Sequence, residues 1–238
     1  MSVFTFHLAK TNVNSALKAF WSPPKAANVP GLIHAECMTS MTLGSASYSP
    51  SRMLIRQVAV FAQWENEAAI DQFLETDKFG KRLAKGWHVR LIFLREWGHI
   101  DEFEIPKESE EVDDPDAPVV AVTIARMKLL QIPRFIRWGR SVEKLVRDHP
   151  GKTLAMAAIT LPRTVSTFSV WQSQKEMLSM VHGHNSVPKP KRHRDAMKER
   201  ERKDFHYQFT TLRFKPIGEY GKWKGGSNYV PNLNPEPT

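Results

Sequence analysis

The sequence predicts an α+β fold in which the same succession of strand, helix, strand, strand, helix and strand occurs twice. Three observations point to this fold. Apolar residues accompany two tryptophans, Trp64 and Trp171, at matched offsets. An acidic, proline-containing stretch at 102–118 divides the chain. On each side of it, segments with strand-like and helix-like periodicity follow one another in the same order.

The matched offsets are the evidence for an internal repeat. Each tryptophan is preceded by a phenylalanine three positions earlier and followed by apolar residues after six, nine and ten positions. The first set is Phe61, Ile70, Phe73 and Leu74, and the second is Phe168, Met177, Met180 and Val181. One such coincidence is common, but five together indicate that one structural unit occurs twice.

In the first half, strands are expected at 3–8, 32–43, 53–64 and 87–97. Asn12 or Asn14 can cap a short helix, which Pro23 and Pro24 end because proline cannot continue one. A second helix is expected at 65–75, with one or two further turns at 78–85.

In the second half, strands are expected at 119–125, 153–160, 165–171 and 206–214, and helices at 133–147, 173–181 and 193–204. Pro162 separates two of the strands, and two prolines make 183–192 a loop. Each half therefore has the element order of the ferredoxin-like split βαβ arrangement.

Two tandem ferredoxin-like βαββαβ repeats, at 1–101 and 119–216, are expected to form a dimeric-α/β-barrel-type fold within a single chain. Joining the two sheets would also remove exposed edge strands. The alternative is two independent domains connected by the acidic linker at 102–118. The tail at 217–238, rich in Gly, Pro and Asn, is expected to be extended or loosely held.

The composition of the 238 residues limits the possible classes of protein. With 41% apolar residues the chain can bury a core, and no apolar run approaches the roughly 20 residues of a membrane helix. Cys37 is the only cysteine, so we expect a buried thiol and a reducing, cytoplasmic location. The net charge of +9 is accompanied by neither a zinc-finger spacing nor an RNA-recognition motif, so nucleic acid is not an expected partner.

His193 is the sharpest candidate for chemistry. On a helix at 193–204 it shares one stripe with Ala196 and Met197, while charged residues occupy the other faces. We therefore expect its imidazole to point inward, where the first repeat has Phe79. Imidazole is the commonest metal ligand and can bind haem iron through one ring nitrogen. The alternative is a histidine that caps the helix and bonds to the backbone.

Two further histidines, His182 and His184, flank Gly183 at the end of the preceding helix. A favourable interaction with the negative end of that helix is their simplest role. Together with His193 they could form a zinc site, although no Cys or Glu completes a recognisable spacing. The sequence does not decide which of the three histidines faces a cavity.

Three other residues are candidates for a binding site. Trp171 and Phe205 lie at strand ends, where they either pack in a core or form a wall for a large apolar ligand. Arg163 lies in a turn between strands and either is solvated or holds a carboxylate by a bidentate bond. A basic run extends from Lys189 to Lys203. It is expected to be a solvated helix face with ion pairs, and the alternative is contact with an anionic membrane.

Parts of both halves resemble the spheroidene monooxygenase family. In the second half the similar residues are the segment 168–171, the pattern His193-x-x-Ala196-Met197-Lys198 and Phe205; in the first half they are Trp64 and Phe79-x-x-Arg82-Leu83. The resemblance covers about residues 53–97 and 119–214. It implies a haem-dependent oxygenase of the dimeric α/β-barrel superfamily that converts a carotenoid to a ketone with O₂. His193 matches the family's helix histidine.

We therefore expect a haem-dependent monooxygenase that inserts oxygen from O₂ into an apolar isoprenoid or carotenoid-like substrate. The barrel interior would hold haem b with His193 on the iron, Trp171 and Phe205 beside it, and Arg163 near a propionate. A separate electron donor is expected, because the sequence has no flavin or nicotinamide motif. The alternatives are a cofactor-free oxygenase or isomerase of the same superfamily, and a non-catalytic protein that binds haem or an apolar ligand.

Overall fold

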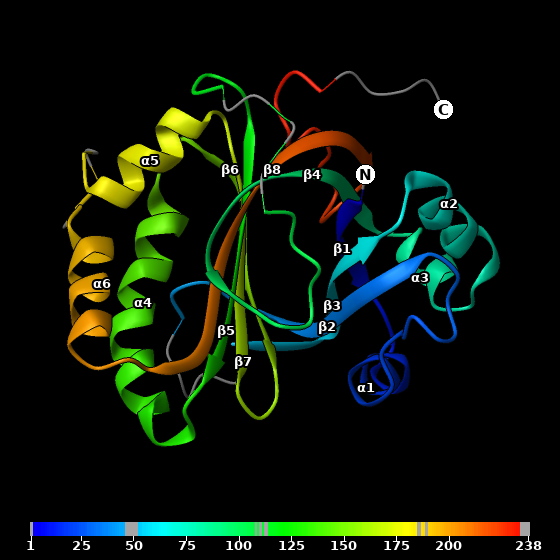
Figure 1. Cartoon of the computed structure of the whole chain (residues 1–238), viewed down its shortest axis with the longest axis horizontal. Helices are drawn as coiled ribbons and strands as arrows, with labels where there is room; N and C mark the ends of the chain where they lie inside the picture. The colour runs from blue at the N-terminus through cyan, green and yellow to red at the C-terminus, as the bar shows by residue number, and fades with distance from the viewer. Residues whose placement is uncertain are drawn as a thin grey trace.

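The computed structural model describes residues 2–45, 52–107, 109, 111, 114–184, 187–188 and 190–233. The first half contains β1 (Val3–Lys10), α1 (Val13–Trp21), β2 (Leu32–Met41), β3 (Met53–Trp64), α2 (Glu67–Thr76), α3 (Gly80–Leu83) and β4 (Trp87–His99). The second half contains β5 (Val119–Met127), η1 (Leu129–Gln131), α4 (Ile132–Asp148), β6 (Lys152–Thr160), β7 (Thr164–Trp171), α5 (Gln174–His182), α6 (Arg192–Arg202) and β8 (His206–Gly221). Every strand and helix expected from the sequence is present in these ranges, although β8 extends well beyond its predicted end at 214 (Figure 1).

The helix starts follow from side-chain caps. The side-chain oxygen of Asn12 accepts a hydrogen bond from the Ser15 N–H, and Asn66 does the same for Ala69. Such oxygens satisfy N–H groups that the first turn of a helix leaves without partners. Among the described residues, no helix combines the length and the hydrophobicity needed to cross a membrane.

The eight strands close into one antiparallel barrel in the order β1-β3-β2-β6-β7-β5-β8-β4. Each half contributes four strands in the same relative order, 4-1-3-2, which confirms the two ferredoxin-like repeats. The halves join where β4 pairs with β8, from Trp87↔Gly221 to His99↔Phe209, and where β2 pairs briefly with β6. Two independent domains are therefore the wrong alternative, whereas the repeat and linker boundaries stay a prediction.

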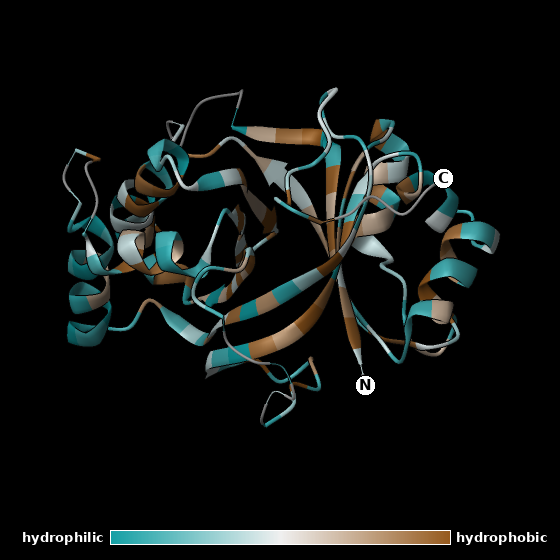
Figure 2. Ribbon diagram, turned by 90° about the horizontal axis from the view of Figure 1, so that it is seen from above, coloured by the Kyte–Doolittle hydropathy of each residue, from teal (hydrophilic) through white to brown (hydrophobic). Residues whose placement is uncertain are grey.

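The inside of the barrel is filled with aromatic and aliphatic side chains. The rings of Phe6 and Phe168, one from each half, stack with centroids 3.8 Å apart, and Phe4 lies 4.9 Å from Phe214. Figure 2 shows hydrophobic residues along the strands and hydrophilic residues over much of the outer helices. The expectation that the barrel interior holds haem is therefore wrong, because large apolar residues on alternate strand positions meet at the centre.

Two chain segments close the ends of the barrel. After β4, the ring of Phe103 packs 5.0 Å from Phe61. After β8, the ring of Tyr229 packs edge-on to Trp87 at 5.8 Å, and Trp223 and Val230 are buried. The described part of the tail thus differs from the extended or loosely held segment that we expected, because its few apolar residues complete the core.

Glu219 is expected to fix the tail to the barrel. Its carboxylate accepts hydrogen bonds from the Trp87 indole N–H at 2.7 Å and from the Tyr229 and Val230 backbone N–H groups at 2.9 and 2.8 Å. Glu219→Ala removes three charge-assisted bonds and is expected to lower the free energy of unfolding by about 3 kcal/mol. Amide exchange at Tyr229 and Val230 is expected to accelerate more than elsewhere. Glu219→Gln keeps an acceptor oxygen and serves as the milder control; equal exchange in all three proteins would contradict this role.

Candidate functional site

A cavity of about 610 Å³ lies between the outer face of the sheet and helices α4, α5 and α6 of the second half, and residues of the first half, among them Met41, Arg52 and Trp97, complete its wall. Figure 1 shows these three helices together on one side of the barrel, opposite α1, α2 and α3. Most of the lining is apolar; it includes Ala121, Ala125, Ile132, Phe135, Trp138, Val142, Met177, Met180, Met197 and Phe209.

The cavity exists because short side chains face the helices. Val3 of β1 pairs with Trp64, and Val119 of β5 pairs with Trp171, so the two strands correspond residue by residue. By this register, Thr123 occupies the position that His7 holds in the first half. Ala121 and Thr123 are only half-buried although helices cover β5, because their side chains are too short to reach those helices.

All four residues proposed as site residues line this cavity: His193, Arg163, Trp171 and Phe205. They come from α6, the β6–β7 turn, the end of β7 and the segment before β8. The structure therefore brings them to one space, but outside the barrel interior. Trp171 is fully buried and donates its indole N–H to the Ser169 hydroxyl oxygen at 2.8 Å, which fixes its ring at one end of the cavity.

His193 lies in the first turn of α6, where that helix meets the end of α5. Its ring hydrogen-bonds the Val181 backbone, and it lines the cavity together with Ala196, Met197 and Arg200, so the predicted stripe faces inward. Burial, together with the nearby His182, lowers the pKa of His193 from its ordinary value. At neutral pH the imidazole is therefore uncharged and keeps a lone pair on one nitrogen, as a metal ligand requires.

His182 and His184 lie where α5 ends. Gly183 between them adopts a left-handed conformation with φ of +77°, which is typical of a residue that follows a helix. His182 lines the cavity and His184 does not; both residues are exposed, and the centroids of their rings lie 6.0 Å apart. Within the described ranges, no group of three His, Cys, Asp or Glu side chains is placed to hold a metal ion.

Arg163 is the cavity arginine that is available to an anion. Its guanidinium lies 4.6 Å from the centre of the Tyr207 ring, and it has no carboxylate partner within the described part of the chain. By contrast, Arg52 is paired with Glu143 at 2.8 Å. An exposed guanidinium at the edge of an apolar cavity can bind a carboxylate of a ligand in bidentate fashion.

His206 is a residue of this cavity that the sequence analysis missed. Asp204 Oδ1 accepts hydrogen bonds from both the backbone N–H and the ring Nδ1 of His206, each at 3.0 Å. Because a carboxylate can only accept, Nδ1 carries the proton and Nε2 is an acceptor. Nε2 lies among the rings of Phe135, Phe205 and Phe209 and has no partner among the described residues. The spacing Asp-x-His next to an aromatic residue was the available signal.

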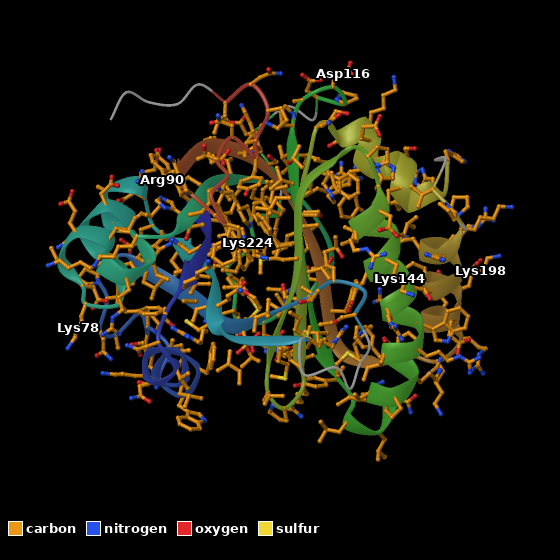
Figure 3. All side chains as sticks on the ribbon, turned by 180° about the vertical axis from the view of Figure 1, so that it is seen from behind. Lys78, Arg90, Asp116, Lys144, Lys198 and Lys224 are labelled. Carbon is orange, nitrogen blue, oxygen red and sulfur yellow. The ribbon has the colours of Figure 1, made fainter. Side chains whose placement is uncertain are left out.

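The basic run on α6 forms a solvated helix face with ion pairs, as expected from the sequence. Glu199 accepts from Arg202 three residues away and from Arg134 of α4, both at 2.8 Å, and these hydrogen bonds, with that from Arg202 first, lower the pKa of Glu199 to about 2. Figure 3 shows Lys198 on the side of α6 that faces away from the sheet. Lys189 lies outside the described residues.

Comparisons with known proteins give only distant likenesses. No family model matches the chain, and no curated protein matches its sequence. The solved structures that resemble its fold include the three described next. An aldoxime dehydratase is 9% identical with a TM-score of 0.48, over 90% of this chain and 81% of that one.

The other two structures come from Listeria. A monooxygenase-like protein from Listeria innocua is 12% identical, with a TM-score of 0.29 over 94% of this chain and 96% of that one. A heme-degrading enzyme from Listeria monocytogenes is 11% identical, with a TM-score of 0.30 over 89% of this chain and 99% of that one. At such distances the functions of these proteins carry no argument for this chain, so its function has to be argued from its own cavity.

Proposed function

We propose that the cavity binds haem b with His193 on the iron, and that the protein is a monooxygenase that inserts oxygen from O₂ into an apolar isoprenoid or carotenoid-like substrate. The observation that carries this proposal is a largely apolar cavity of about 610 Å³ with an uncharged imidazole in its wall. Its volume lies within the range of about 300–1,000 Å³ that is typical of cofactor and small-molecule sites.

The residues of the cavity fit the chemistry of haem. The partly buried rings of Phe135, Trp138 and Phe209 offer aromatic surface to a flat macrocycle, while Trp171 and Phe205 line the cavity as almost fully buried rings. The hydrogen bond to Val181 fixes the orientation of His193. Arg163 at the exposed edge suits a propionate, which is an anion at the rim of an otherwise apolar group. Bound haem would supply the activation of O₂, with electrons from a separate donor.

The chain's own contribution would be positioning and the exclusion of water. Met177, Met180 and Met197 are unbranched and flexible, so they can adapt to a long apolar substrate. The sequence resemblance to the spheroidene monooxygenase family supports a carotenoid-like substrate, since it covers the helix that carries His193.

The Asp204–His206 pair favours a second candidate function, a cofactor-free oxygenase or isomerase. Asp204 holds the imidazole in the tautomer that leaves Nε2 as a base, and burial lowers the pKa of His206 to about 4, so it is uncharged at neutral pH. In this candidate His206 would take a proton from an acidic carbon or hydroxyl of the substrate. Nε2 is enclosed by aromatic rings, so a ring has to move before substrate reaches it.

The visible spectrum separates the candidates. Protein purified from haem-supplemented cells is expected to show a Soret band and to convert a carotenoid when O₂ and a reductant are supplied. Colourless protein that oxidises or isomerises a substrate, and loses this activity in His206→Phe, would support the second candidate. Protein without colour or turnover that still binds an apolar ligand would be a carrier, and both enzymatic proposals would fail.

A further inference from the structure

Four large apolar side chains are exposed together at one end of the second half, and we call this surface the leucine tip. It consists of Leu129, Leu130, Leu161 and Tyr207, whose exposed fractions are 53%, 93%, 68% and 45%. Single exposed apolar residues are common on protein surfaces. A group of them on adjacent segments marks a binding surface.

Backbone hydrogen bonds place the three segments of the leucine tip side by side. The Met127 N–H donates to the Arg163 carbonyl, and the Lys128 N–H donates to the Phe205 carbonyl, both at 2.8 Å. The chain before η1 is thereby tied to the β6–β7 turn and to the start of β8. In Figure 1 the start of α4 and the β6–β7 turn both project at the foot of the molecule.

The shape of the leucine tip favours a lipid surface over a rigid protein surface. Leu129 and Leu130 lie in the single turn of η1, and Leu161 lies in the tight turn between β6 and β7. Because the chain reverses direction at the β6–β7 turn, Leu161 projects beyond the sheet and does not lie flat on it. Projecting apolar groups can enter the boundary between lipid headgroups and acyl chains, whereas a rigid protein surface would need a matching hole for each.

The charges around the leucine tip favour anionic lipid. Lys128, Arg163 and Lys203 are exposed, and none has a carboxylate partner in the part of the chain that the structure describes. Two of the neighbouring acids are paired with arginines, Asp204 with Arg200 at 3.8 Å and Glu102 with Arg126 at 2.7 Å. Free cations beside projecting apolar groups are the combination that binds a negatively charged membrane surface.

The leucine tip is continuous with the cavity. Pro162 and Arg163 belong to the same turn as Leu161 and also line the cavity, as does Phe205 on the adjacent segment. We propose that the leucine tip docks on a bilayer containing anionic lipid, so that an apolar ligand passes between the membrane and the cavity without entering water. Of the basic run from Lys189 to Lys203, only Lys203 belongs to the surroundings of the leucine tip, and docking does not depend on haem.

Flotation of the full chain with lipid vesicles tests the proposal. The wild type is expected to float with vesicles of phosphatidylcholine and phosphatidylserine, and less with phosphatidylcholine alone. The double variant Leu130→Glu, Leu161→Glu is expected to lower the binding constant for vesicles, obtained from the fraction of protein that floats, by about tenfold or more. The reason is that two exposed apolar groups no longer enter the lipid. Both positions are exposed, so the thermal midpoint is expected to stay unchanged.

The matched control is Trp21→Glu, which removes a side chain that is 82% exposed on α1 in the other half. This variant is expected to bind vesicles like the wild type. Equal binding by the double leucine variant, or an equal loss in Trp21→Glu, would overturn the proposal. So would a dimer in sedimentation that Leu130→Glu dissociates, because a second copy would then cover the surface. Colourless protein that floats normally would reject the haem proposal and leave this one standing.

Discussion

His193→Ala is expected to lower the affinity for haem by about 100-fold or more, as measured by titration of the purified protein with hemin and the rise of the Soret band. Loss of a group that only orients a metal ligand already costs about 10–100-fold, and this variant removes the ligand itself. The fold is expected to persist, because His193 is only partly buried and its helix is held at the other end by the Glu199–Arg134 pair.

Two control variants make the result specific. His99→Ala removes an imidazole that is 68% exposed and lies outside the cavity, and it is expected to bind hemin like the wild type. His206→Phe keeps the aromatic enclosure but removes the second imidazole of the cavity. If His206→Phe loses the Soret band while His193→Ala keeps it, the iron ligand is His206 and the assignment to His193 is wrong.

Acid is expected to destabilise the protein strongly through two stacked histidines of the first half. His7 is completely buried, neither of its ring nitrogens has a partner among the described residues, and its ring lies 4.8 Å from that of His88. Burial is the main cause that lowers both pKa values, that of His88 to about 4, and the nearby Arg90 lowers them further. Arg90 is itself paired with Glu67 and Asp71 of α2.

The direction of the pH dependence follows from these pKa values. Both imidazoles are uncharged in the folded protein, whereas in the unfolded chain they bind protons below about pH 6.5. The stabilising contribution of the two uncharged imidazoles is therefore fully present above that pH. The free energy of unfolding falls as the pH drops toward 4, by roughly 3 kcal/mol for His88 alone. Urea unfolding at pH 7.5 and 4.5 measures the difference.

His7→Phe is expected to reduce this dependence, because phenylalanine can keep the ring stack and takes no proton. The contributions of His88 and of His206, whose pKa burial also lowers to about 4, remain. His99→Gln, at an exposed position, is the control and is expected to keep the wild-type slope. An unchanged slope in His7→Phe would show that acid acts through other groups. At pH 7.5 we expect His7→Phe to be as stable as the wild type or more so, since a buried imidazole without partners gains nothing from its polarity.

Much of the fold was predictable because its signals are local. The matched positions around Trp64 and Trp171 identified the repeat, and alternation and capping residues located the strands and helices to within a few residues, except at the end of β8. The stripe of His193, Ala196 and Met197 correctly indicated an inward face, because a helix fixes which side chains point the same way. These features depend on residues that lie within a few turns of one another in the chain.

The site itself depended on tertiary structure. Strand alternation indicates two faces of a sheet but not which face borders an open space. The sequence analysis therefore placed haem in the barrel interior, whereas the cavity lies behind β5. His206 reaches that space because a register shift against Arg126 and Met127 leaves Tyr207 without an opposite residue and changes the side on which the strand presents its next side chain.

The sequence by itself determined the duplicated halves, their elements and the inward stripe of α6. Only the tertiary structure decided that the centre is solid, that the cavity lies under α4, α5 and α6, and that Leu130 and Leu161 share a surface. The physical reason is that periodicity acts between neighbours in the chain. Empty space and exposed surface instead depend on how far side chains from distant segments reach toward one another, as the short Thr123 shows at the position where His7 fills the other half.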